Sequence, residues 1–353
     1  MTVRDQVWSA QDTSPSAIEA ALRQLLVDFH RENEGYWPAR VLNLVCVVDR
    51  QWSGEIANRL RGVGRYHASR TIVCSVDGRR TKLDATATIA TDTEPKPGEF
   101  ALLRETVVVE CGPQHLEHLD SIVDPLVVTD LATVMWSPHG HWQALDSLRR
   151  LAQVVLLDSV DEPDIDEALR RACSFSDELY VVDLAWLRST PWRERVAAAF
   201  DPASRRHDLE TISEIHVRHH PDSTVAGLLL LGWLATRLGW ESTRLMKRGD
   251  DLVGKLHAHR QDIQVRLEPT PMGVRGLAGL TIETAGGETL SLDRGDGGLQ
   301  AVRRNRKGAL HAWTILGASR GEAGILGEGI RQALLRDPTY RPALNAANAL
   351  VHG

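Results

Sequence analysis

The chain has 353 residues, enough for two domains, and its 42% apolar and 25% charged residues are the balance of a globular protein. Its 41 basic and 47 acidic residues give a net charge of −6, which excludes the overall positive charge of a nucleic-acid-binding protein. The longest apolar run, Val225 to Ala235, is too short to span a bilayer, so we expect no membrane segment.

The first half of the chain has the pattern of an α/β domain. Residues 1–35 are expected to form an N-terminal helical extension, because Ile18, Leu22 and Phe29 recur at helical spacing. From residue 36 to residue 180, continuous apolar runs alternate with helix-like segments. Such runs are typical of strands that are buried on both faces. The pattern predicts a mostly parallel, three-layer α/β domain over residues 36–180.

The second half has a different order of predicted helices and strands, which indicates an α+β domain over residues 181–336. Thr190 and Ser223 are expected to cap two helices, the second of which stops at Gly239. Short strands separated by turns then follow from residue 250 to residue 316, which indicates an antiparallel meander. A helix over residues 322–335 is expected to pack against this meander, and residues 337–353 to form a tail.

One motif resembles a hydrolase site. Residues 317–321 fit the G-x-S-x-G pattern with Ser319 at its centre, but a nucleophile elbow needs an acid and then a histidine downstream. Only Asp337 and His352 follow in that order, and His352 is the penultimate residue. Ser319 with Glu322 fits a helix capping box better. We therefore expect no catalytic residue here.

Cofactor and metal motifs are incomplete. Gly62 and Gly64 begin a dinucleotide-binding pattern, but His67 stands at the third glycine position and the segment follows a predicted helix instead of a strand. The local histidine pairs lack the spacing of zinc ligands. Four widely spaced cysteines without a CxxC pair, and no signal-peptide pattern, predict reduced thiols in a cytoplasmic protein. We expect no cofactor and no metal.

Two segments carry the residue types of binding surfaces. The basic run Arg303 to Lys307 fits either a solvated face or a contact with an acidic partner. The segment Asp183 to Arg193 holds two tryptophans and two arginines near the predicted domain junction, and these residue types dominate binding hot spots. Its tryptophans either contact a partner or hold the domains together, and the sequence leaves both possibilities open.

The segment Asp183-Leu184-Ala185-Trp186-Leu187-Arg188-Ser189-Thr190-Pro191-Trp192-Arg193 resembles the D-L-x-W-x-R-x-T-P-W-R signature of the OpcA family, which comprises glucose-6-phosphate dehydrogenase assembly proteins. Stretches at residues 40–45, 67–72, 121–126 and 231–240 resemble further parts of the family in the same order. Trp136-Ser137-Pro138 departs from the family's Trp-Trp-Pro, which puts a contact of the second tryptophan in doubt.

The resemblance implies an accessory protein without catalytic residues that binds glucose-6-phosphate dehydrogenase and promotes its assembly and activation in the oxidative pentose phosphate pathway. The residues expected to bind the partner are Asp183, Trp186, Arg188, Thr190, Pro191, Trp192, Arg193 and Trp136. The alternative is a sugar-phosphate- or nucleotide-binding α/β enzyme. Such an enzyme requires a polar pocket at the carboxyl ends of the parallel strands.

Overall fold

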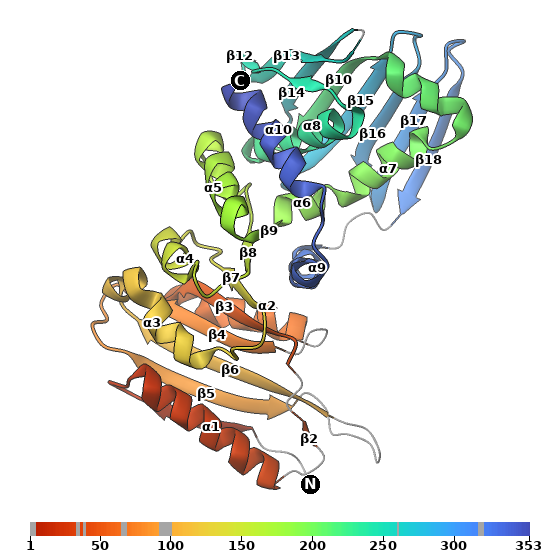
Figure 1. The fold of residues 1–353 in the computed structure, drawn as a ribbon. Coiled ribbons are helices and arrows are strands. Elements are labelled where there is room, and N and C mark those ends of the chain that lie inside the picture. Colours follow the sequence, from red (N-terminus) through yellow and green to blue (C-terminus); the bar gives the residue numbers. More distant parts are fainter. Residues whose placement is uncertain are drawn as a thin grey trace. The chain divides into compact units, whose positions relative to one another are not determined.

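The computed structural model describes residues 5–32, 36–37, 40–64, 69–91, 101–259, 261–316 and 321–353, which form two compact units. The first unit comprises Met1–Leu157, Glu178–Val182 and Leu326–Leu335; the second comprises Asp158–Asp177, Asp183–Ile325 and Arg336–Gly353. Each unit contains one large sheet (Figure 1). None of the helices in the described part of the chain combines the length and the hydropathy of a membrane span.

The first sheet is mostly parallel, as the sequence predicts. Its strand order is β1-β5-β6-β4-β3-β7-β8-β9, and the short β2 lies beside β6. Strands β6, β4, β3, β7 and β8 run parallel, whereas β5 is antiparallel to both of its neighbours. The strands are β1 (Gln6–Ala10), β2 (Tyr36–Trp37), β3 (Leu42–Asp49), β4 (Ser69–Val76), β5 (Asp84–Thr91), β6 (Ala101–Cys111), β7 (Thr133–Trp136), β8 (Val154–Leu157) and β9 (Tyr180–Asp183).

Continuous apolar runs explain why the central strands are covered on both faces. Every side chain from Leu42 to Val48 in β3 is buried, which requires a layer on each side of the sheet. Helix α2 (Ser53–Gly64) packs against β3 and β4, and α1 (Pro15–Glu32) contacts the short α3 (Leu119–Val123) (Figure 1). Helix α4 (Trp142–Leu148) packs beside α3. The three-layer α/β arrangement is therefore confirmed.

The N-terminal residues contribute to this sheet. Strand β1 pairs with β5 along its whole length, and α1 buries Ile18, Leu22 and Phe29 against the unit. The segment that we expected as an extension thus supplies an edge strand and a covering helix.

The second sheet is largely antiparallel, and the sequence analysis missed its central strand. Strand β10 (Ile212–His219) lies in the middle of the sheet, parallel to β14 and antiparallel to β15. The expected meander of residues 250–316 is therefore split around β10. The sheet order is β11-β13-β14-β10-β15-β16-β17-β18, with β12 beside β13. The strands are β11 (Glu241–Ser242), β12 (Met246–Arg248), β13 (Asp251–His257), β14 (Asp262–Pro269), β15 (Leu277–Thr284), β16 (Thr289–Gly295), β17 (Gly298–Arg304) and β18 (Leu310–Leu316).

Two helices cover one face of the second sheet. Helix α8 (Thr224–Leu238) packs against β10 and β14, and α10 (Tyr340–His352) packs along α8 (Figure 1). A Cβ at Gly232 would lie 2.2 Å from the carbonyl oxygen of Ala343, so glycine is what lets the two helices approach this closely. The residues that we expected as a loose tail are therefore a packed helix. Residues 326–335 of α9 (Gly321–Leu335) belong to the first unit, not to the sheet against which we expected them.

Two helix starts, those of α8 and α7 (Thr190–Phe200), differ in detail from the prediction. The hydroxyl of Ser223 accepts the backbone N–H of Gly276 at 2.9 Å and makes no cap bond to α8. Helix α7 includes Thr190, whose hydroxyl accepts from Arg193 instead of capping. Helix α5 (Ile165–Glu178) begins after Asp164, whose carboxylate accepts the N–H of Asp166 at 2.9 Å. Gly239 ends α8 at φ 68°, as predicted.

Candidate functional site

The segment Asp183 to Arg193 forms the end of β9, the short helix α6 (Leu184–Arg188) and the start of α7. Asp183 caps α6, because its carboxylate accepts the N–H of Ala185 at 2.9 Å. The same carboxylate accepts the N–H of Ser159 at 3.2 Å and the hydroxyl of Tyr340 at 3.1 Å. This one side chain therefore links three parts of the second unit that are far apart in the sequence.

Asp183 is 1% exposed. Burial, and next the negative charge of Asp158, raise the pKa of the Asp183 carboxyl to about 6. Its three hydrogen bonds favour the charged form and oppose that shift. A buried carboxyl of this kind organises the surrounding backbone.

Trp186 and Arg193 form a stacked pair inside the second unit. The guanidinium carbon of Arg193 lies 3.4 Å from the centre of the Trp186 ring, within the range of a strong cation–π contact. The indole N–H of Trp186 donates to the carboxylate of Asp337 at 2.8 Å. Arg193 also donates to the carbonyl of Trp186 at 3.1 Å and to the hydroxyl of Thr190 at 2.9 Å. Burial lowers the pKa of Arg193 to about 10, which still leaves it charged at neutral pH.

The second arginine of the segment, Arg188, is also paired with a carboxylate. Arg188 donates two hydrogen bonds to the carboxylate of Asp158, at 2.8 and 2.7 Å, and both side chains are mostly buried. This forked geometry fixes the loop after β8 against the end of α6.

The structure thus brings the signature residues together, but as an internal framework. Trp186 and Trp192 are each 2% exposed and Arg193 is 9% exposed, while Thr190 and Pro191 are half-buried at the start of α7. Trp136 belongs to the first unit, where it ends β7 and is 5% exposed. In this conformation the three largest side chains of the segment do not form an open surface. Their role as partner contacts remains a prediction.

The other stretches of family resemblance also have internal partners. Asn43 is fully buried, and its side-chain amide donates to the carbonyls of Val128 and Leu131 while its oxygen accepts the N–H of Val128. Arg40 and Arg70 both donate to Glu105, at 2.5 and 2.7 Å, and Glu105 is 1% exposed. These partners are 35 to 88 positions away in the sequence. No local signal could have revealed them.

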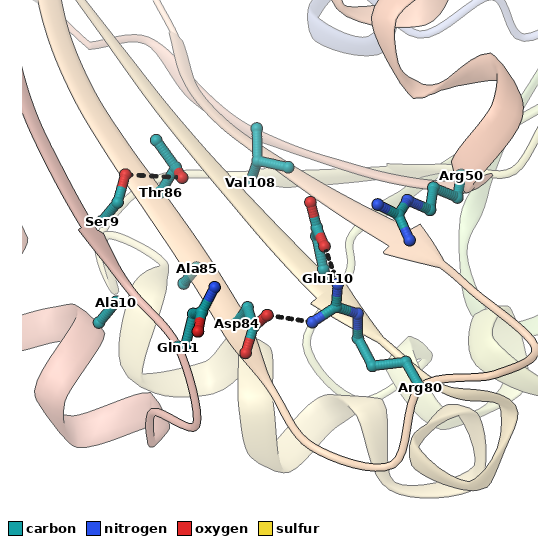
Figure 2. A pocket seen from close by; sticks show the side chains of 10 residues that line it. All are labelled: Ser9, Ala10, Gln11, Arg50, Arg80, Asp84, Ala85, Thr86, Val108 and Glu110. Atoms are coloured by element: carbon teal, nitrogen blue, oxygen red, sulfur yellow. Dashed lines mark hydrogen bonds and ion pairs between the residues drawn. The ribbon is translucent and has the colours of Figure 1, made fainter.

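A polar cavity of about 530 Å³ lies at the carboxyl ends of β1, β3 and β6 in the first unit, where α/β sheets commonly bind ligands (Figure 2). Sequence analysis did not identify its residues. The lining residues are Ser9, Ala10, Gln11, Arg50, Arg80, Asp84, Ala85, Thr86, Val108 and Glu110.

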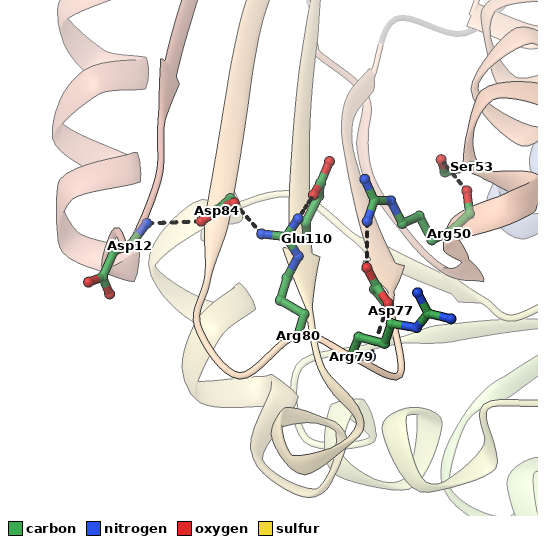
Figure 3. Close-up of polar contacts among 8 residues, drawn as sticks. All are labelled: Asp12, Arg50, Ser53, Asp77, Arg79, Arg80, Asp84 and Glu110. Atoms are coloured by element: carbon green, nitrogen blue, oxygen red, sulfur yellow. Dashed lines mark hydrogen bonds and ion pairs between the residues drawn. The ribbon is translucent and has the colours of Figure 1, made fainter.

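The charges around this cavity are paired with one another. Arg80 lies between the carboxylates of Asp84 and Glu110, and Arg50 donates to Asp77 (Figure 3). The N–H of Asp12 donates to Asp84 at 2.9 Å and lowers the pKa of that carboxyl. The N–H of Arg79 does the same for Asp77.

This balance decides what the cavity can bind. The lining carries two arginines, Arg50 and Arg80, and two carboxylates, Asp84 and Glu110, so its formal charges balance. Because Arg50 and Arg80 are already paired with carboxylates, a phosphate group would have to open one of these ion pairs to bind an arginine. The described lining offers the hydroxyls of Ser9 and Thr86, bonded to each other at 3.0 Å, but no histidine or cysteine to act as a base or nucleophile.

The structure describes some, but not all, residues of the nucleotide, hydrolase and cysteine motifs. Gly62 and Gly64 lie in the last turn of α2, outside the strand–turn–helix context of a dinucleotide site. Ser319 lies outside the described residues, whereas Asp337 is bonded to Trp186 and Thr339. Cys46, Cys74 and Cys111 are buried free thiols on β3, β4 and β6. Within the described ranges, no three His, Cys, Asp or Glu side chains converge as metal ligands.

Comparison with solved structures gives distant likenesses, among them two forms of the regulator Gal80p. The transcriptional regulator Gal80p from Kluyveromyces lactis superposes with a TM-score of 0.47 at 8% identity, over 87% of each chain. A super-repressor mutant of Gal80p from Saccharomyces cerevisiae gives 0.48 at 7% identity, over 84% of each chain. Similarity at this level carries no functional information.

Comparison with known sequences is more specific. The OxPP cycle protein OpcA of Synechococcus elongatus is 26% identical over 182 residues, which are 49% of this chain and 41% of that protein. The OpcA of Nostoc punctiforme is 30% identical over 170 residues, which are 45% of this chain and 35% of the relative. The matches therefore span less than half of the length of these curated relatives.

Two domain families match in order along the chain, and both are domains of a glucose-6-phosphate dehydrogenase subunit. Residues 61–174 match the family of its N-terminal domain, and residues 179–344 match the family of its C-terminal domain. The signature segment lies at the start of the second match, where its residues build the framework described above. The chain belongs to the OpcA family.

Proposed function

We propose that this chain is a cytoplasmic, non-catalytic accessory protein that binds glucose-6-phosphate dehydrogenase and promotes its assembly and its active state. The observation that carries the proposal is the ordered match to both domain families of the dehydrogenase-associated OpcA proteins. The relatives bear the name putative OxPP cycle protein, which supports the same pathway.

The first unit's cavity supports an accessory role over the alternative of a sugar-phosphate- or nucleotide-binding enzyme. Its position suits a ligand, but Arg50 and Arg80 already hold carboxylates, and the lining has no excess of positive charge. Binding of NADP or glucose 6-phosphate would have to break these ion pairs. We therefore expect neither compound alone to raise the melting temperature of the chain, and a clear shift would favour the enzyme.

The buried residues of the signature segment support an exposed surface that can bind the partner. Trp186, Trp192 and Arg193 are enclosed, so the side chains of this region that can reach a partner are the exposed ones on α7, such as Glu194 and Ala198. The buried network fixes the position of this exposed side. We propose that the segment contributes to partner binding in this indirect way.

Activation without chemistry has a thermodynamic requirement. The chain must bind the active form of the dehydrogenase more tightly than the inactive form. A tenfold shift of that equilibrium needs about 1.4 kcal/mol of differential affinity, which a few well-packed contacts supply.

The test is a titration of the purified chain into the dehydrogenase of its own organism. We expect NADP-dependent oxidation of glucose 6-phosphate to rise and saturate, and light scattering on a sizing column to show a larger complex. The chain alone should give no turnover. The proposal is wrong if no complex forms at a protein concentration of about 10 μM, roughly ten times the Kd of a micromolar interaction, and if the rate and KM stay unchanged.

A further inference from the structure

Strand β18 is the last strand of the second sheet, and within the described residues no strand pairs with its outer edge (Figure 1). The turn before it is closed by the N–H of Asn305 donating to the carbonyl of Ala309 at 3.0 Å. Antiparallel ladders alternate between hydrogen-bonded and non-hydrogen-bonded pairs, so His311 and Trp313 bond inward to β17. The backbone N–H and C=O groups of Leu310, Ala312 and Thr314 consequently point to the free edge.

This edge lacks the features that normally prevent strand pairing. Residues 310–316 include no charged residue and no proline, and the Leu310 side chain is 70% exposed. The opposite end of the same sheet is protected: β11 and β12 have only two and three residues, and β12 carries Lys247 and Arg248. The open edge at β18 is therefore a local property of this strand.

The turn that leads into β18 is basic, and most of its cationic side chains are exposed to solvent. Arg303 is held inside the unit by Asp208, at 3.2 Å, and by the carbonyl of Ala199, at 2.9 Å. Arg304, Arg306 and Lys307 are exposed at the end of the hairpin. A partner strand that lies along β18 would meet these cations at one end, so acidic residues there would strengthen the pairing.

We propose that the free edge of β18 is a strand-addition site for an extended segment of the dehydrogenase, apolar or β-branched along the strand and acidic at the end that faces Lys307. The backbone groups of Leu310, Ala312 and Thr314 provide the affinity, and the basic turn sets the register. A second copy of this chain fits less well, because β18 itself has no acidic side chain to meet the turn. The proposal rests on the proposed function.

The test uses the full chain and the dehydrogenase of its own organism. Hydrogen exchange of the amides of Ala312 and Thr314 should slow when the dehydrogenase is added, whereas the inward amide of Trp313 is already protected in the free chain. Thr314→Pro removes an outward N–H and leaves the β17 ladder intact. We expect it to raise Kd at least about tenfold, while Thr314→Ala, which keeps the N–H, changes Kd less than about twofold.

A charge variant tests the second half of the proposal without changing the backbone. Lys307→Glu should weaken binding several-fold and reduce its salt dependence, and the matched control Lys247→Glu on β12 should bind like wild type. Because Lys307 is exposed, this arm remains decisive if Thr314→Pro fails to fold.

Each outcome separates the two proposals. Binding of Thr314→Pro and Lys307→Glu as tight as wild type, with unchanged amide exchange, would overturn strand addition and leave the accessory function standing. Failure of the wild-type chain to bind the dehydrogenase would overturn both. Dimerisation of the chain alone that Thr314→Pro abolishes would assign the edge to a second copy and contradict the proposed occupant.

Discussion

Replacing Arg193 with alanine distinguishes a framework residue from a binding hot spot. The side chain is 9% exposed and donates to the carbonyl of Trp186 and to the hydroxyls of Ser189 and Thr190. It also stacks on the Trp186 ring and lies 3.8 Å from the carboxylate of Asp337. Its removal empties this space and takes away the cation that lies 3.8 Å from Asp337.

The cost follows from these contacts. Loss of hydrogen bonds from a charged donor costs about 1.5–3 kcal/mol, and loss of a desolvated cation–π contact adds about 1–2 kcal/mol. The wild-type chain must desolvate the guanidinium when it folds, and the alanine variant avoids this cost. The avoided cost offsets part of the loss. We therefore expect a net destabilisation of about 2–4 kcal/mol. For a unit of this size it corresponds to a fall of roughly 5–15 °C in melting temperature.

The assay measures stability and binding on the same samples. Thermal unfolding should show the fall in melting temperature, while affinity for the dehydrogenase, measured well below the melting temperature of the variant, should stay within about threefold of wild type. Glu194→Ala, next to it on the exposed side of α7, is the control and should melt within about 1–2 °C of wild type. An Arg193→Ala variant that melts like wild type but binds about thirtyfold more weakly would refute the reasoning.

Three further predictions concern stability. Glu105→Gln leaves Arg40 and Arg70 without their shared carboxylate and should destabilise the first unit by about 3 kcal/mol, as denaturant unfolding will show. Gly232→Ala forces α8 and α10 apart and should lower the melting temperature of the second unit, whereas unchanged melting would contradict the close approach. Asp183 has a pKa of about 6 in the folded state against 3.8 ordinarily, so its contribution to stability is largest below about pH 4 and is lost as the pH rises to about 6. Relative to wild type, Asp183→Asn should therefore gain up to about 3 kcal/mol between pH 4 and 7 in urea unfolding, and a difference that does not vary with pH would disprove the assignment.

Sequence periodicity was sufficient to predict the central strands of the first sheet because they are continuous apolar runs, but it did not predict the edge strand β1. The sequence analysis missed β10, although Ile215 and Val217 alternate with His216 and Arg218 as in a half-buried strand. The strand holds its place through partners on both sides, at residues 264–269 and 277–284, and that pairing is not a local property. The same reason explains why residues 337–353 were expected as a tail: their apolar stripe is short, and it forms a buried face only against α8.

The candidate residues of the segment 183–193 lie together in the second unit, whereas Trp136 lies in the first, and their role in partner binding stays a prediction. Tryptophan and arginine are the residue types of binding hot spots, and they are also the types that build a buried cation–π pair. What decides between the two is the position of Asp337 and Tyr340, 151 and 157 residues away from their partners in the segment. The polar cavity in the first unit was missed because its charges come from strand ends and turns that share no motif.

The buried charges of the signature segment suggest how such a protein could act on an enzyme. Burying Asp183 and Arg193 is costly, and apolar side chains of similar volume would often stabilise a unit as well. What the charged network adds is one fixed geometry, because each hydrogen bond specifies a direction as well as a contact. A chain that works only by favouring one conformation of its partner needs a surface that keeps its own shape when bound. The family signature would then mark the framework, and the choice of partner would lie in exposed groups, such as the free edge of β18 and its basic turn.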